Sequence, residues 1–246
     1  MIIYLLACIA SFFPCAALYF WQRNGIKKDK AWQKLCDRTL WKGVLSVFPI
    51  VLLSGICFFS LKLIKIQETH PLLYEMLYTF IVLALAEEIV KYRTFKSVLQ
   101  KTDYPCSWLD IAMLSTIVGI GFGCIESVVY MLSASVPVVL IRGLCVPHAG
   151  YGFVVGYFYG KGLVTGKPKQ RWIGFALAWF IHGLYDFSLS EEFAAINDNL
   201  MIVALALAVL DILLVINLIV FVHRAKKREE CTQPLSNSCC EAHAGR

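Results

Sequence analysis

The stretch W-L-D-I-A-M-L-S-T-I-V-G-I-G-F-G-C-I-E-S-V-V-Y-M-L, residues 108–132, decides the fold class of this chain. Only two of its residues carry a charge, Asp110 near its start and Glu126 well inside it. About 20 apolar residues cross the hydrocarbon core of a bilayer as an α-helix, which satisfies its own backbone hydrogen bonds. The stretch therefore predicts a membrane-spanning helix that carries a carboxylate, Glu126, within the bilayer.

Apolar runs of similar length lie on both sides of this stretch. They cover residues 1–20, 43–64, 72–92, 137–160, 172–189 and 200–222. Hydrophobic residues make up 59% of the chain and charged residues 16%, whereas a soluble domain carries about 25% charged residues. We therefore expect an all-α, polytopic membrane helix bundle of about seven transmembrane helices, with one transmembrane domain over residues 1–223. We expect the first run to be an uncleaved anchor, since it lacks a small-residue cleavage site.

Basic side chains are concentrated in every second connecting segment. These segments are residues 21–42, 91–101, 161–171 and 224–228. The 190–199 segment is acidic, so the positive-inside rule predicts an external N-terminus and a cytoplasmic C-terminus. Topology and contact with anionic lipid explain the net charge of +6, and no nucleic-acid partner is expected. The tail, residues 224–246, is predicted to be cytoplasmic and disordered.

Several ionisable side chains lie inside the apolar runs. A charge in the bilayer core costs roughly 2.5 kcal/mol or more, so such residues mark a functional site by default. They are Glu87, Glu88, Glu126, His148 and His182, with Asp186 one turn beyond the last. Glutamate and histidine are also the side chains that activate water in hydrolysis. Their presence on several helices predicts a buried hydrolytic site.

Two adjacent carboxylates, Glu87 and Glu88, precede Lys91 at the end of the run 72–92. At helical spacings of four and three residues, both can reach the same ammonium group. They point about 100° apart, so one can pair with a cation while the other faces a cavity. The alternative interpretation is a salt bridge at the cytoplasmic membrane interface.

Glu126 has no basic residue within one helical turn, and Arg142 in the next apolar run is a candidate partner for it. Pro147 frees a backbone carbonyl and is expected to kink the helix just before His148. The structural alternatives are a Glu126 that only hydrogen-bonds a neighbouring helix and a His148 that is only hydrogen-bonded. Asp110 is interpreted as a cap or as a functional residue.

His182 and Asp186 are four residues apart and therefore share one helix face. This spacing suits a carboxylate that orients a general-base histidine, or two ligands of one metal ion. It also suits a pair that only holds two helices together. Asp211, in the last apolar run, has no assigned partner.

These motifs, taken in order, resemble the PrsW family of intramembrane proteases. The matching residues are Glu87, Glu88, Lys91, Gly121, Phe122, Glu126, Arg142, His148, Gly152, Gly156, His182, Gly183, Tyr185 and Asp186. The match covers residues 72–189, with Ser127 in place of the asparagine that usually follows the glutamate. The resemblance implies an intramembrane endopeptidase of the bacterial plasma membrane. Its substrates would be single-span membrane proteins such as anti-sigma factors, which it clips in stress signalling.

The expected mechanism is hydrolysis by activated water. One of Glu87 and Glu88, by preference Glu88, is the general base. His148 and His182 bind a divalent metal or stabilise the oxyanion, and Asp186 orients His182.

The remaining polar groups have supporting roles. Glu126 is a ligand or a second acid, and Lys91 and Arg142 hold the carboxylates. A zinc ion is possible, with His148, His182, Glu126 and Asp186 as candidate ligands. The metal-free version is preferred because a catalytic zinc site uses three protein ligands and only the two histidines are obvious ones.

Two other function classes compete with a peptidase. Intramembrane Glu and His chains also serve proton-coupled transporters. A catalytically silent immunity or interaction protein is the second alternative. The absence of an internal repeat speaks against a transporter, and the absence of H-E-x-x-H excludes a zincin-type site.

Overall fold

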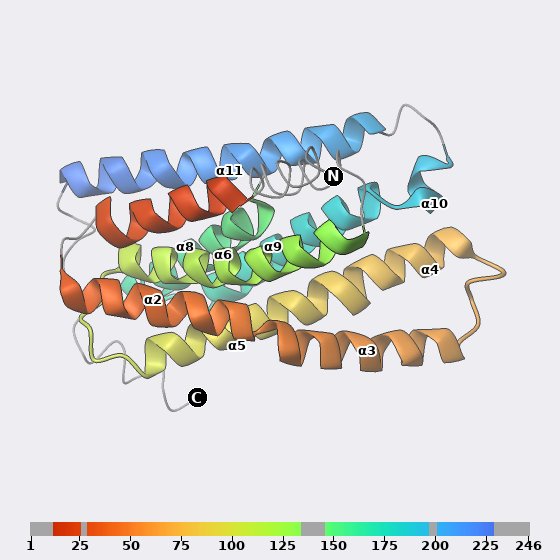
Figure 1. Cartoon of the computed structure of the whole chain (residues 1–246), viewed down its shortest axis with the longest axis horizontal. Helices are drawn as coiled ribbons and strands as arrows, with labels where there is room; N and C mark the ends of the chain where they lie inside the picture. Colours follow the sequence, from red (N-terminus) through yellow and green to blue (C-terminus); the bar gives the residue numbers. More distant parts are fainter. Residues whose placement is uncertain (1–11, 26–28, 134–145, 197–200, 229–246) are drawn as a thin grey trace.

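The computed structural model describes residues 12–25, 29–133, 146–196 and 201–228, and these residues are helical with short connections. Residues 12–20 form a helix that continues into η1. The further elements, in which η marks a π-helix, are η1 (Trp21–Gly25), α2 (Lys30–Leu45), α3 (Val47–Leu63), α4 (Pro71–Leu77), η2 (Tyr78–Leu85), α5 (Ala86–Gln100), α6 (Trp108–Ser133), α8 (Pro147–Val164), α9 (Lys169–Ser188), α10 (Glu191–Ala194) and α11 (Met201–Arg228). The long helices run roughly along the long axis of the molecule (Figure 1). The described residues contain no strand, which confirms the all-α prediction.

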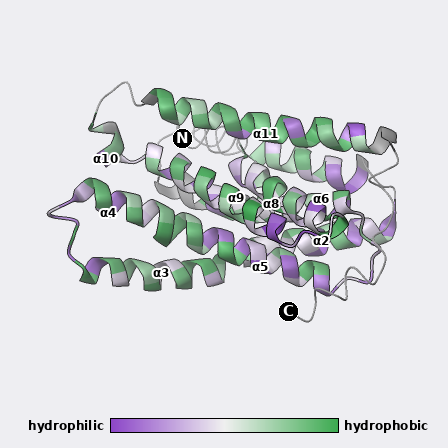
Figure 2. Cartoon of the chain, turned by 180° about the vertical axis from the view of Figure 1, so that it is seen from behind, coloured by the Kyte–Doolittle hydropathy of each residue, from purple (hydrophilic) through white to green (hydrophobic). Residues whose placement is uncertain are grey.

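Three helices in the described part of the chain are long and apolar enough to cross a membrane: Lys30–Leu63, Trp108–Val128 and Ile202–Ala225. The ribbons of α3 and α11 are apolar over most of their length (Figure 2). Large side chains such as Phe48, Phe59 and Leu205 are exposed on these two helices, as expected for a surface that faces lipid.

Helix α6 is the centre of the bundle. The apolar part of α6, within Trp108–Val128, is 72% buried, and the helix packs mainly against α8 and α2. Glycines make these contacts close: a Cβ added at Gly156 of α8 would lie 2.7 Å from the Cα of Ala112. A Cβ added at Gly119 of α6 would lie 2.0 Å from the carbonyl oxygen of His148. Small residues therefore allow the backbones of α6 and α8 to approach closely.

We expect Gly119→Ala to lower the free energy of unfolding by about 1–3 kcal/mol, because the new methyl group would collide with the α8 backbone. Thermal unfolding of the purified protein in detergent measures this loss. Gly55→Ala is the matched control, since among the described residues its added Cβ has no atom within 4 Å apart from its chain neighbours and the backbone of its own helix. Equal stability of the two variants would contradict the close packing of α6 and α8.

The basic segment 21–42 is not the loop that charge alone predicted. Asp29 caps α2 by accepting a hydrogen bond from the Ala31 backbone N–H at 2.9 Å. The helix then buries a face whose members recur at helical spacing. They are Trp32, Leu35, Cys36, Thr39 and Gly43. This spacing places the lysines on the other faces, so the segment is an amphipathic helix that joins α3.

The predicted run 137–160 is not one helix with a kink. Val146 has left-handed backbone angles, φ 47° and ψ 46°, and α8 begins at the next residue, Pro147. Proline favours the first position of a helix, because it lacks the N–H that would have no partner there. Pro147 therefore starts the helix that carries His148. Residues 134–145, with Arg142 among them, lie outside the described residues.

The predicted run 72–92 is helical from Pro71 to Gln100, with a π-helical stretch in its middle. This stretch, η2, ends at Leu85, directly before the two glutamates. In the described part of the chain, α11 extends to Arg228 and so into the predicted tail. The remainder of that tail, with Cys239 and Cys240, lies outside the described residues. The orientation in the membrane stays a prediction.

Candidate metal and catalytic centre

The structure brings together the ionisable residues of four helices. Helix α5 contributes Glu87, Glu88 and Lys91, α6 contributes Glu126, α8 contributes His148, and α9 contributes His182 and Asp186. The described site residues are linked by contacts of 2.5 to 3.7 Å. The structure therefore places these groups together in one cluster, as the sequence predicted.

The first turns of α5 direct Glu87 and Glu88 into the bundle, where they are 7% and 2% exposed. The ammonium of Lys91, itself 6% exposed, lies 2.6 Å from Glu88 Oε1 and 3.5 Å from Glu87 Oε2. One cation therefore pairs with both carboxylates, as the i,i+3 and i,i+4 spacing predicts. All three groups are buried within the helix bundle.

His182 lies between carboxylates of two helices. Its Nδ1 is 3.0 Å from Glu88 Oε1, and its Nε2 is 3.2 Å from Asp186 Oδ2 and 3.7 Å from Glu87 Oε2. The side chain is 1% exposed. Asp186 therefore contacts the histidine of its own helix face, which is the pairing that the sequence predicts.

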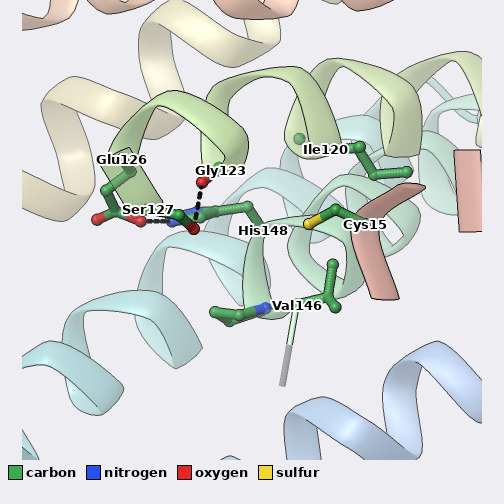
Figure 3. A pocket seen from close by; sticks show the side chains of 9 residues that line it. Cys15, Ile120, Gly123, Glu126, Ser127, Val146 and His148 are labelled. Carbon is green, nitrogen blue, oxygen red and sulfur yellow. Dashed lines mark hydrogen bonds and ion pairs between the residues drawn. The ribbon is translucent and has the colours of Figure 1, made fainter. Parts of the chain in front are cut away.

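His148 connects α8 to α5 and α6. Its Nδ1 lies 3.0 Å from Lys91 Nζ, and its Nε2 lies 2.5 Å from Glu126 Oε2. The rings of His148 and His182 are 5.1 Å apart and nearly perpendicular, at 83°. Figure 3 shows the Glu126–His148 contact at the edge of a hollow. In the described residues, the partner of Glu126 across helices is thus a histidine.

The hollow beside His148 has a volume of about 10 Å³, which is room for about one water molecule. Polar groups line one side of it: the carboxylate of Glu126, the hydroxyl of Ser127 and the ring of His148 (Figure 3). Gly119 and Gly123 leave the space that side chains would otherwise fill. A water held here would have the polar partners that a buried water needs.

Three buried residues could hold a metal ion. Glu87, His148 and His182 each offer a ligand atom, and these atoms lie within 4.8 Å of one another. Two histidines and one glutamate are a donor set of catalytic zinc sites, which leave a fourth position open. Other carboxylates hold the histidines in place, as is common around metal ligands: Glu88 and Asp186 contact His182. These residues fit a divalent metal, and Glu87 is a candidate third ligand that the sequence alone did not indicate.

Two further residues at the site were not predicted. The ring of Tyr151 stacks on the ring of His182, with centroids 5.0 Å apart and an interplanar angle of 24°. The Tyr151 hydroxyl donates a hydrogen bond of 3.1 Å to Asp211 Oδ2, and both residues are buried. In the sequence Asp211 stands out as an isolated acid in an apolar run, which marks the residue but not its partner.

Asp110 has a structural role. Its carboxylate accepts hydrogen bonds from the backbone N–H and the hydroxyl of Ser107, at 2.7 and 2.8 Å. The Ser107 hydroxyl in turn accepts from the Asp110 backbone N–H at 3.2 Å. This reciprocal pair caps the start of α6, so the interpretation of Asp110 as a cap is confirmed.

A comparison with known families matches residues 30–218 to the family described as PrsW family intramembrane metalloprotease. The chain belongs to the PrsW family. The resemblance found at residues 72–189 is thereby confirmed, and the match extends over α2 and α3 on one side and much of α11 on the other. With its apolar helices, this PrsW-family chain is a multi-pass membrane protein of the bacterial membrane.

Curated relatives agree with the family match. A protein named Protease PrsW from Geobacillus kaustophilus is 27% identical over 151 residues, which cover 60% of this chain and 63% of that protein. Proteins of the same name from Oceanobacillus iheyensis and Clostridioides difficile are 27% and 28% identical, over 45% and 48% of this chain and 53% and 55% of their own lengths. The chain thus spans less than two thirds of the length of these PrsW relatives. No solved structure matches it.

Proposed function

We propose that this chain is a metal-dependent intramembrane peptidase that hydrolyses a peptide bond of membrane-tethered proteins. The observation that carries the proposal is the buried group Glu87, His148 and His182, whose ligand atoms lie within 4.8 Å of one another. The description of the family as metalloproteases supports it, and weighs against the metal-free preference of the sequence analysis.

Charge also favours a cation at this place. Glu87 and Glu88 are both buried and share the single ammonium of Lys91. An uncompensated buried carboxylate is costly, and a divalent metal would offset it. A metal held by Glu87, His148 and His182 would supply polarisation of the scissile carbonyl and a more acidic water.

Glu126 is the better candidate for the general base. It lines the hollow that has room for about one water, and its side chain is 18% exposed, whereas that of Glu88 is 2% exposed. A general base must be within hydrogen-bond reach of the proton that it removes. Glu88 was the base expected from the sequence, but Glu88 Oε1 is already shared between Lys91 Nζ and His182 Nδ1. We therefore assign to Glu88 the positioning of His182, together with Asp186.

The location of the site limits how a substrate reaches it. The catalytic groups lie in the interior of a helix bundle that is apolar outside, so a membrane-tethered segment would reach them from the bilayer. We propose a single-span membrane protein as the substrate class. An anti-sigma factor is the substrate that the resemblance to the family implies.

The proposal is tested with the purified protein in detergent and a single-span substrate that carries a tag at each end. We expect a single cut in or beside the span, located by mass spectrometry of the products. A transporter or a silent immunity protein would leave the substrate intact even with divalent metal added. Uncut substrate under those conditions would therefore overturn the proposed function.

We expect Glu88→Gln to weaken metal binding by about 10–100-fold, because this side chain orients His182 rather than acting on water. Dialysis against graded chelator, followed by elemental analysis, measures the affinity. A saturating metal concentration should restore most of the activity. Full metal affinity combined with lost activity would instead support Glu88 as the general base.

The orientation in the membrane is proposed from the basic segments alone. The N-terminus and the 190–199 loop are expected outside, and the tail inside. A cysteine introduced just after Arg228 and probed with an impermeant thiol reagent tests this orientation, in a variant without the native tail cysteines. Labelling in intact cells would contradict the orientation, and labelling only after lysis would agree with it.

A further inference from the structure

An open groove of about 650 Å³ lies between α5 and α9. Along α5 it extends from Ile89, next to the two glutamates, toward the C-terminus of the helix. Four of its lining residues on α5, Ile89, Arg93, Lys96 and Gln100, follow a spacing of four, three and four residues. This spacing places them in a row along one face of the helix. Trp172 of α9 lies opposite, near the start of its helix.

The row changes from apolar to polar along its length. Ile89 and Phe175 are at the end nearer to the catalytic groups. Arg93, Lys96 and Gln100 follow toward the C-terminus of α5. One end of the groove is therefore apolar and the other end is basic and polar. A phospholipid has the matching division between its acyl chains and its charged headgroup.

Aromatic rings form the boundary between the two ends. Tyr92 stacks on Trp172 with centroids 6.0 Å apart and an interplanar angle of 28°, and it meets the ring of Phe175 at 5.7 Å. Trp172 is 57% exposed. Exposed tryptophan and tyrosine rings are typical of the headgroup level of a membrane.

The charges of the two basic side chains are not neutralised by any acidic residue that the structure describes. Within the described part of the chain, no carboxylate lies within ion-pair distance of Arg93 or Lys96. Arg93 is exposed and Lys96 is half-buried. Two cations one helical turn apart thus face the groove and are available to an anion.

We propose that this groove binds one anionic phospholipid. Its phosphate lies between Arg93 and Lys96, its glycerol region lies against Trp172, and an acyl chain follows Ile89 and Phe175. Basic pockets between transmembrane helices recognise anionic headgroups in this way. A soluble anion or an acidic peptide would use the basic end and leave the apolar end uncovered, so an amphiphile fits the groove better.

Native mass spectrometry of the purified full-length chain tests the proposal with added phosphatidylglycerol and with phosphatidylcholine of the same acyl chains. We expect one retained phosphatidylglycerol per chain and much weaker retention of phosphatidylcholine. The double variant Arg93→Gln/Lys96→Gln should bind phosphatidylglycerol roughly 30-fold more weakly, since each basic group near an anionic surface contributes about fivefold. The charge-preserving pair Arg93→Lys/Lys96→Arg should bind it like the wild type.

Lys30→Gln/Lys34→Gln is the matched control. These two lysines are exposed on α2, and their replacement removes the same charge outside the groove. Unchanged binding in the control, together with the loss in the groove variant, supports the site. Equal retention of the two lipids, an unaffected groove variant, or displacement by inorganic phosphate alone would overturn it. None of these readouts depends on peptidase activity.

Discussion

His182→Ala is expected to remove both the bound metal and the peptidase activity. His182 belongs to the buried group of three ligands, and two helices contribute the carboxylates that contact it. With one of three protein ligands lost, the site keeps too few ligands for a catalytic metal. Metal ions contribute several kcal/mol to a hydrolytic transition state, and about 1.4 kcal/mol corresponds to tenfold in rate, so we expect at least a 1,000-fold loss.

His148→Ala should behave in the same way, because His148 supplies a second ligand from another helix. Elemental analysis of the purified variants, with cleavage assays on the same samples, measures both losses. His223→Ala, at an exposed position of α11, controls for the loss of an imidazole elsewhere. If both variants kept stoichiometric metal, the proposed ligand set would be wrong. If the wild type worked without metal and ignored chelators, the metal-free chemistry would be correct.

The second large effect is expected for Glu126→Gln. The amide keeps the shape of the side chain and its contact to His148, but it cannot accept a proton from water. General-base catalysis contributes typically about 10²- to 10⁴-fold, so we expect a fall in kcat of that size with the metal retained. This outcome differs from that of Glu88→Gln, for which weaker metal binding and recovery at high metal are expected.

Cleavage kinetics and metal content of the same preparation separate these cases. Ser127→Ala is the control from the same hollow, because the Ser127 hydroxyl donates to the Gly123 carbonyl of its own helix at 2.8 Å. We expect it to change the rate less than tenfold. A Glu126→Gln variant with wild-type kcat would exclude Glu126 as the base and return that role to Glu87 or Glu88.

Much of the fold could be predicted from the lengths of the apolar runs and from the positions of a few charged residues. The runs 108–132 and 200–222 coincide with helices because such runs must satisfy their backbone hydrogen bonds internally in lipid. The pairs Glu87–Lys91 and His182–Asp186 are contacts within one helix, so their spacing alone predicts them.

Two predictions about the helices were wrong, one for the basic segment 21–42 and one for Pro147. The segment 21–42 is rich in basic residues and was expected to be a connecting segment, but from Lys30 onward its apolar residues recur at helical spacing and pack on α6. Pro147 was expected to bend a helix and instead begins one, because Val146 takes a left-handed conformation before it. Sequence spacing does not reveal which of these two roles a proline takes.

Contacts between helices were the part of the site that could not be predicted. The choice between Glu87 and Glu88 as a ligand depends on the rotation of α5, which follows directly on the π-helical stretch η2. The stacking of Tyr151 on His182, and its hydrogen bond to Asp211, join residues far apart in the chain. Each depends on how helices pack, for which a single sequence contains no direct signal.

X-ray absorption spectroscopy of the zinc-loaded, full-length protein tests the central claim most directly, since it reports the atoms bound to the metal. A site made of Glu87, His148 and His182 predicts nitrogen and oxygen neighbours at about 2.0–2.2 Å, two of them imidazoles. His182→Ala should abolish this signal. Sulfur neighbours at about 2.3 Å would place the metal on cysteines instead, and a protein that takes up neither zinc nor any other divalent metal would contradict the metal centre altogether.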